Sequence, residues 1–407
     1  MSYVPPHKRR SKEPVRPCPV PESVSRKFTR NLNLDGRQNT SGQGRKVIYA
    51  KDCILKWFLV GSDGIEDEIS PSVKLVPVSS DYSEWNWRDG RKPWVLVNND
   101  AGEKDAEIGE TVVRTPWLSV AEKVEDDIFM AFGQVKNGMD HPALEEVTPR
   151  LVARFGKILL NGHPSFSSES LKGGLVAEST SRESKKSFCT NVPTSYMESI
   201  KDAAVLKLGC CMEKKDIYCV ILSDKTHPDS TISCKCTVKE DKRLVMHRVE
   251  LNALRHCVAD VSCLNQNIDM RLMVYSKRIL TALTENEICN IRKLVDSAVV
   301  DPNVKGGLRW PLGEAVSGDR YSVCGVWHVI NTVYRSSTFR LKVREVDRFD
   351  FRAGTGGAAR EVILVLKGIS QKLEEGGEVE RSSVSDMLKD ALKMIWDHFL
   401  SADPYFM

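Results

Sequence analysis

The stretch Arg340-Leu341-Lys342-Val343-Arg344-Glu345-Val346-Asp347-Arg348-Phe349 alternates basic and apolar residues with a period of two. A β-strand turns successive side chains to opposite faces. The pattern therefore predicts a strand with one basic face, which carries Arg340, Lys342, Arg344 and Arg348 and is interrupted by Val346. Cations about 6–7 Å apart on one face match the spacing of backbone phosphates, so these four residues are candidate polyanion ligands. The alternative is the solvent-exposed face of an amphipathic strand.

Strand-like segments continue on both sides of this stretch. They cover residues 150–160, 216–224, 231–239, 243–252, 256–263, 269–277, 321–330, 338–346 and 360–367. About nine strands of similar length with few crossover helices favour an antiparallel barrel or sandwich, and a closed barrel leaves no exposed edge. Helices are predicted after the capping box Thr284–Glu287 and from about Ser383. The glycine-rich run 354–357 predicts a hairpin turn.

A smaller α/β unit is predicted over residues 46–140. Strands are expected at 46–49, 73–78 and 94–97, and a helix that carries Cys53, Ile54, Trp57 and Phe58 is expected to end at Gly61. A second helix is expected to open at the capping box Ser119–Glu122, with one apolar face formed by Val120, Val124, Ile128, Ala131 and Val135. The predicted fold class is thus α+β, with a barrel domain over 145–407 that contains a Ser-rich insertion at about 164–188.

The N-terminal segment differs in composition from the rest of the chain. Residues 1–46 hold 11 Lys and Arg against 3 Asp and Glu, which leaves 48 against 52 for the remainder. Six of the 18 prolines fall in residues 1–45, without a hydrophobic period. The segment is predicted to be a disordered basic arm. Its cations Lys8, Arg9 and Arg10 are candidates for contact with a polyanion or a protein partner.

Several classes of protein are excluded by what the sequence lacks. No stretch approaches the roughly 18 uncharged apolar residues of a membrane span, and no secretory signal opens the chain, so a cytoplasmic or nuclear location is expected. The 12 cysteines include no Cys-x-x-Cys, and the phosphate-loop and Gly-x-Ser-x-Gly motifs are missing, so no metal or cofactor is expected. Trp85 and Trp87 lie in a polar stretch, where they either stack on a base or pack under a loop.

The chain also resembles two groups of known proteins. The opening segments MSYVPPHKRRSK, RKFTRNLNL and KVIYAKDCILKWFLVG resemble those of a plant protein family with no assigned activity, over essentially the whole chain. The run from Tyr3 to Arg9 is similar to a short motif near the start of DEAD-box RNA helicases that act in translation.

Residues of about 145–370 resemble the metal-dependent RNA 5′-triphosphatases, whose fold is an eight-stranded tunnel. The segments that carry the resemblance are Ala153–Ile158, His256–Val261 with Asn265–Leu272, and Asp319–Ser322 with Arg360–Leu364. The resemblance implies a tunnel-like barrel and adds Arg154 and Arg271 to the candidate polyanion ligands. It also implies Glu361 as a catalytic carboxylate and Mg²⁺ or Mn²⁺ as cofactor, should activity be retained.

The chain departs from that family where the metal ligands belong. Arg150 and Val152 stand where the family has Glu-x-Glu, and Ile363 and Val365 follow Glu361 in place of further glutamates. Lys277 lies near the position of another. A divalent metal needs several oxygen ligands, which one carboxylate cannot supply. We therefore expect non-catalytic binding of RNA, including 5′-phosphorylated ends. The alternatives are an active phosphohydrolase and a protein–protein adaptor that uses the barrel as a scaffold.

Overall fold

The computed structural model describes most of the region after residue 46. The described residues are 47–60, 73–78, 93–98, 115–137, 145–161, 176–178, 185–207, 211–228, 230–264, 266–311, 316–375 and 381–401. The predicted arm (1–45) and Trp85 and Trp87 lie outside these ranges, as does most of the Ser-rich segment.

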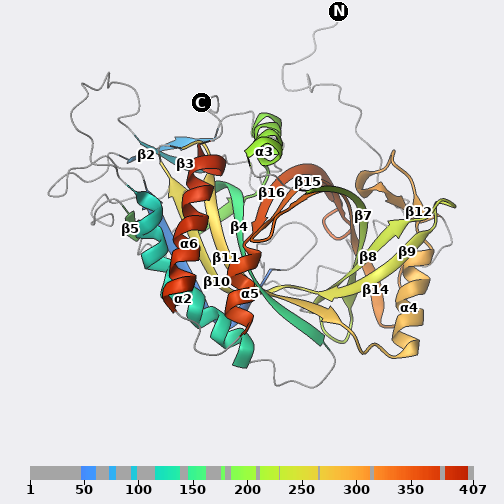
Figure 1. Ribbon diagram of the computed structural model, residues 1–407. Helices are drawn as coiled ribbons and strands as arrows, with labels where there is room; N and C mark the ends of the chain where they lie inside the picture. The colour runs from blue at the N-terminus through green and yellow to red at the C-terminus, as the bar shows by residue number, and fades with distance from the viewer. Residues whose placement is uncertain are drawn as a thin grey trace, which may run out of the picture.

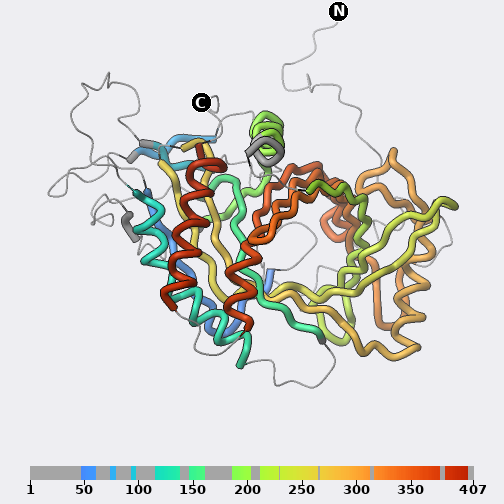
Figure 2. The backbone as a smooth tube through the Cα atoms, in the orientation of Figure 1, coloured from blue at the N-terminus to red at the C-terminus, as the bar shows by residue number. Residues whose placement is uncertain are grey.

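Eight antiparallel strands form a closed ring (Figures 1 and 2). The ring closes where β4 pairs with β11, from Gly156 opposite Asp269 to Glu145 opposite Leu280. Neighbours around the ring are β4 (Glu145–Asn161), β16 (Thr355–Val365), β15 (Arg340–Asp350), β14 (Tyr321–Arg335), β7 (Cys211–Asp224), β8 (Thr231–Val238), β9 (Leu244–Leu251) and β11 (Asp269–Leu280). The fold is thus a mixed α and β structure built around a strand barrel.

The outer face of the ring is apolar. On β15, Leu341 and Val343 are buried outside the ring, whereas Arg340, Lys342 and Arg344 alternate with them on the inner face. Removing apolar surface from water contributes roughly 25 cal/mol per Å². The apolar side chains of β15, which alternate with the cations in the sequence, therefore stabilise the fold by packing outward against the covering helices.

Most of the covering helices pack on one side of the ring. The helices α2 (Pro116–Asn137), α5 (Lys367–Glu375) and α6 (Arg381–Ile395) share one core with β4, β11 and β16, and α3 (Thr194–Lys207) joins it through Tyr196. The chain continues from α6 into the π-helical turn η5 (Trp396–Leu400). There Phe399 stacks on Phe155 with ring centroids 4.9 Å apart, and its carbonyl accepts a 2.9 Å hydrogen bond from Tyr196 Oη.

A second core lies on the other side of the ring, under α4 (Glu285–Asp296). Next to α4, the short strands β12 (Val299–Val300) and β13 (Leu308–Arg309) flank the 3₁₀ turn η4 (Lys305–Gly307). Trp310 Nε1 donates a 3.1 Å hydrogen bond to the Leu294 carbonyl, which ties this segment to α4. Arg320 joins β7 to α4 by contacting Asp224 at 2.8 Å as well as Glu287.

The sheet extends beyond the ring at β11. There β10 (Leu254–Cys263) pairs antiparallel with β11, β1 (Ile48–Val60) pairs parallel with β10, and β5 (Val176–Glu178) pairs with β1. On the other side, the long β4 pairs with β6 (Lys185–Cys189) and with β3 (Trp94–Asn98), which carries β2 (Val73–Pro77). Elements from both predicted domains therefore share one sheet, and Phe58 and Val124 belong to the same core as Leu151.

The structure confirms the nine strands expected after residue 149, and the turn before β16 contains Gly354 at φ +62°. It also confirms the Thr284–Glu287 capping box and the buried face of α2. The helix expected around Cys53–Phe58 is wrong, because these residues belong to β1. Residues 57–60 of β1 are buried on both faces, as in parallel sheets, so the sequence shows no period of two there. The predicted start at Ser119 is also wrong, because α2 begins at Pro116.

None of the helices in the described part of the chain combines the length and apolar character needed to cross a membrane.

Substitution of Gly156 on β4 tests how closely the backbone of β6 approaches the ring. A Cβ atom at this position would lie 1.9 Å from the Cys189 carbonyl oxygen, a backbone atom that cannot move aside cheaply. We expect Gly156→Ala to lower the free energy of unfolding by about 1–3 kcal/mol, the usual range for overpacking. Gly133→Ala in α2 is the matched control. Its Cβ meets nothing within 4 Å, so a change of at most about 1 kcal/mol, toward higher stability, is expected in urea unfolding. Equal losses for both variants would contradict the close approach.

Candidate polyanion-binding site

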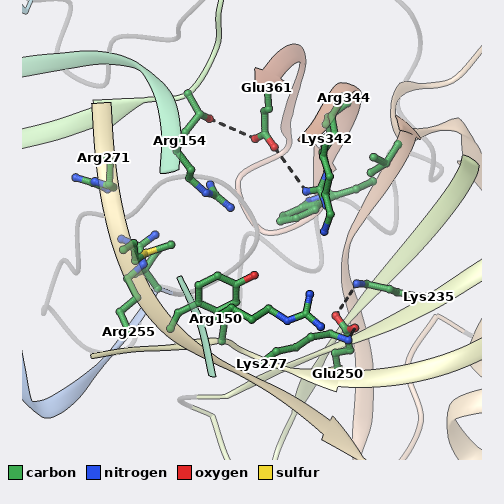
Figure 3. A pocket seen from close by; sticks show the side chains of 18 of the residues that line it. Arg150, Arg154, Lys235, Glu250, Arg255, Arg271, Lys277, Lys342, Arg344 and Glu361 are labelled. Carbon is green, nitrogen blue, oxygen red and sulfur yellow. Dashed lines mark hydrogen bonds and ion pairs between the residues drawn. The ribbon is translucent and has the colours of Figure 1, made fainter. Parts of the chain in front are cut away.

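The ring encloses a cavity of about 510 Å³ whose lining is strongly basic (Figure 3). This volume lies within the roughly 300–1,000 Å³ of typical ligand sites. Eleven basic residues line the cavity, against the two acidic residues Glu250 and Glu361. The basic residues are Arg150, Arg154, Lys235, Arg248, Arg255, Arg271, Lys277, Arg340, Lys342, Arg344 and Arg348.

The four cations predicted on one strand face all line this cavity. Arg340, Lys342, Arg344 and Arg348 project from β15, and Val346 between them lines the same wall. They therefore lie on the inner wall of the ring and not on an outer, fully solvated face. Arg154 on β4 also lines the cavity (Figure 3), opposite Ile363 of β16. Whether these residues bind a polyanion stays a prediction.

Arg271 differs from the other predicted ligands because its charge is balanced by a carboxylate outside the ring strands, that of Asp260. Its Nε and Nη2 donate to the two carboxylate oxygens of Asp260 on β10, at 2.6 and 3.0 Å. Lys186 on β6 lies 3.7 Å from the same carboxylate. Arg271 lies at the side of the cavity where β11 pairs with β10 (Figure 3).

Glu361 on β16 is buried among arginines. Its carboxylate contacts Arg348, lies 3.9 Å from Arg344, and accepts a 3.3 Å hydrogen bond from Thr190 Oγ1. Burial alone would raise the pKa of Glu361, but Arg348, Arg154 and Arg344 together lower it to about 2. The one carboxylate that the triphosphatase resemblance retains is therefore ionised and held by cations of the wall.

Glu250 on β9 is the second anion of the cavity, and no sequence pattern predicted it. Its carboxylate lies 2.6 Å from Lys235, 2.8 Å from Arg248 and 3.0 Å from Lys277. Burial would raise its pKa, but Lys235 and Lys277 lower it to about 2. Val249 and Glu250 are adjacent and both buried, so no alternation marks Glu250 in the sequence.

Five cations of the wall have no carboxylate partner among the described residues. No described Asp or Glu lies within 4 Å of the side chains of Arg150, Arg154, Arg255, Arg340 and Lys342. Lys342 lies between arginines, and burial, Arg344 and Arg150 hold its pKa well below the ordinary lysine value. A multiply charged anion in the cavity would relieve this repulsion, because its charges would pair with cations that have no other partner.

The cavity does not fit a divalent metal. Hard cations require several oxygen ligands, and both carboxylates here already contact Arg or Lys. In the part of the chain that the structure describes, no group of three or more His, Cys, Asp or Glu is placed to hold a metal ion. The arrangement suits direct binding of phosphate groups by Arg and Lys.

Comparison with known proteins places the sequence in a family. Residues 41–399 match the model of the domain of unknown function DUF7903. The chain belongs to the DUF7903 family. A search of curated proteins gave no match.

Solved structures similar to this DUF7903 protein include RNA triphosphatases. The Pct1 RNA triphosphatase of S. pombe is 8% identical with a TM-score of 0.45, and the match covers 74% of this chain and 100% of that one. The Mimivirus capping enzyme triphosphatase is 8% identical with a TM-score of 0.30, covering 66% and 98%. A putative adenylate cyclase from Bacillus halodurans is 10% identical with a TM-score of 0.24, covering 53% and 89%. All scores are below 0.5, so the description of the barrel rests on its own strand pairing.

Glu361 makes the stability of this DUF7903 protein depend on pH in a defined direction. Its pKa in the folded protein, about 2, lies below the ordinary value of 4.5. The ionised carboxylate therefore stabilises the fold above about pH 4.5, and this contribution is lost as the pH falls toward about 2. We expect Glu361→Gln to lower the free energy of unfolding by about 3 kcal/mol at neutral pH and by clearly less near pH 3.

The matched control for this substitution is Glu345→Gln, an exposed residue on the outer face of the neighbouring strand β15. It should change stability little at either pH. Urea unfolding at the two pH values measures both variants. A loss for Glu361→Gln that is the same at both pH values would show that its ionised form is not held by the arginines.

Proposed function

We propose that this protein binds the 5′-phosphorylated end of RNA inside the ring and does not hydrolyse it. The observation that carries the proposal is the imbalance of charge in the cavity of the ring. Eleven basic residues face two acidic ones, and both acidic residues are already ion-paired. The ligand that such a wall lacks is an anion with several charges close together, which a 5′-polyphosphate end supplies.

The arrangement of the unpaired cations supports a phosphate chain as ligand. Arg340 and Lys342 project from β15 at alternate positions, about 6–7 Å apart. Arg150 and Arg154 project from β4, and Arg150 lowers the pKa of Lys342 by its charge, so the two sets act on the same space. Arginine provides bidentate contacts to phosphate, while lysine acts as a point charge.

RNA is favoured over a protein partner inside the cavity because the wall combines cations with aromatic side chains. Trp327, Tyr275 and Phe188 line the same cavity as the arginines. Aromatic rings among cations are typical of single-stranded nucleic-acid sites. The use of the barrel as a scaffold for another protein is thus the less favoured proposal.

Salt dependence tests the binding of RNA in the ring. We expect the double variant Arg340→Gln, Lys342→Gln to bind 5′-triphosphorylated RNA more weakly, with a salt slope smaller by about one to two units. Each phosphate contact to a single strand contributes about 0.7 to this slope. Folding should be retained, since neither side chain has a carboxylate partner among the described residues. Fluorescence anisotropy at several salt concentrations measures the slope.

Two control variants accompany this measurement. Arg292→Gln with Lys293→Gln removes two exposed cations of α4, which does not line the cavity, and should leave the slope unchanged. Arg9→Gln with Arg10→Gln removes cations of the N-terminal segment. If only the Arg9 and Arg10 variant loses RNA binding, the proposal that RNA binds in the ring is overturned. The use of the barrel as a scaffold for another protein would then be favoured.

Metal dependence tests the absence of catalysis. We expect no release of phosphate from 5′-triphosphorylated RNA above background in Mg²⁺ or Mn²⁺, because Glu361 and Glu250 are held by cations and Arg150 replaces a metal ligand of the resembling enzymes. Binding should persist in EDTA. Metal-dependent turnover that Glu361→Ala abolishes would instead establish an active phosphohydrolase.

A further inference from the structure

The cavity continues beyond the ring into a mouth. We use this name for Arg255 on β10, Arg271 on β11, and Phe188 on β6, with Tyr49 of β1 beside Arg255. The strands β1, β6 and β10 are not part of the ring, so their side chains add a second surface to the ring site. Figure 3 shows Arg255 and Arg271 on one side of the cavity, away from Lys235, Glu250 and Lys277.

The basic wall is continuous from the mouth to the ring. Burial and then the charges of Arg271 and Arg154 lower the pKa of Arg255 to about 10. The pKa of Arg154 is in turn lowered, mainly by burial; inside the ring, the charge of Glu361 raises it and that of Arg344 lowers it. A chain of phosphates could therefore follow arginines from the mouth to the interior of the ring without leaving the positive potential.

The arginines of the mouth lie against aromatic rings. Arg271 Cζ is 4.6 Å from the centroid of the Phe188 ring, and Arg255 Cζ is 5.4 Å from that of Tyr49. Within the ring, Arg348 Cζ is 5.1 Å from the centroid of Trp327. Aromatic rings and guanidinium planes are the surfaces on which unpaired nucleobases stack. A site for phosphate alone requires none of them.

The two arginines of the mouth are not equivalent. Arg271 is neutralised by its two hydrogen bonds to Asp260, which also fix the plane of its guanidinium. Arg255 has no carboxylate within 4 Å among the described residues, and its Nη1 donates to Tyr49 Oη at 3.3 Å. Arg271 with Phe188 is thus suited to stack a base, and Arg255 to contact a phosphate.

We infer that the mouth binds the nucleotides that follow the 5′ end of a single-stranded RNA, and that the ligand is an oligonucleotide and not a free nucleotide. This inference rests on the proposed function of the ring. Arg255 contacts a backbone phosphate, while Phe188 and Arg271 stack a base. Paired bases of a duplex offer no free face for such stacking, so the RNA is single-stranded at this point.

The experiment compares three probes that share a phosphate chain: ATP, a 5′-triphosphorylated oligoadenylate, and inorganic polyphosphate. The full-length protein should bind the oligoadenylate at least about tenfold more tightly than ATP, since stacking of one base contributes about 1–3 kcal/mol. Phe188→Leu, which keeps an apolar side chain, should remove most of that advantage and change the affinity for ATP and polyphosphate less than about twofold. Arg255→Gln should weaken the binding of oligoadenylate and of polyphosphate but not the binding of ATP. The exposed residue Arg292 provides the control variant Arg292→Gln, which should change none of the three affinities.

The outcomes separate the mouth from the ring. If ATP and oligoadenylate bind with equal affinity while ATP binding still depends on Arg340 and Lys342, the mouth does not bind nucleotides. The proposed binding in the ring would then stand. Equal weakening of oligoadenylate and polyphosphate by Phe188→Leu would overturn base stacking. Failure to bind any of the three probes would overturn the ring site together with the mouth. A melting curve for each variant shows that the fold is retained.

Discussion

The contacts of Glu361 and Glu250 with the cavity cations are what make a basic barrel interior tolerable. Each carboxylate is buried and contacts cations of a neighbouring strand: Glu361 contacts Arg344 and Arg348 of β15, and Glu250 contacts Lys235 of β8 and Lys277 of β11. Removing one partner of a buried ion pair leaves an uncompensated charge, which is far more costly than a lost surface contact. These two carboxylates therefore hold strands together electrostatically, and the same contacts withhold them from any metal ion.

The polar interior has a second consequence for the fold. The inner face of the ring carries many charged side chains, and its apolar residues form only small clusters, such as that of Val152, Met273, Ile363 and Val365. The larger apolar clusters face outward and are buried under α2, α5 and α6 on one side and α4 on the other. The helices are thus required for the stability of the barrel, and they leave the interior available to a ligand.

The strands that extend the sheet change the site as well as the fold. Because β11 pairs with β9 at one end and with β10 along the rest, the sheet divides at β11, and the cavity continues past the ring. The aromatic residues beside the arginines of the mouth come from β1 and β6, which are not strands of the ring. Membership of the DUF7903 family covers these segments and the ring alike.

The sequence by itself determined the strands of the ring and the basic face of β15, because alternation along one strand is a local property. It favoured a helix around Cys53–Phe58 in place of β1, in part because residues 57–60 are buried on both faces of the sheet and show no alternation. The composition of the cavity was decided only by the tertiary structure. Glu250 and Lys235 carry no signal of their own, and they meet Lys277 because β8, β9 and β11 are neighbours in a closed ring. Which cations lack a carboxylate, and how far a pKa shifts, depend on side chains brought together from strands far apart in the chain, and periodicity within one strand contains no information about them.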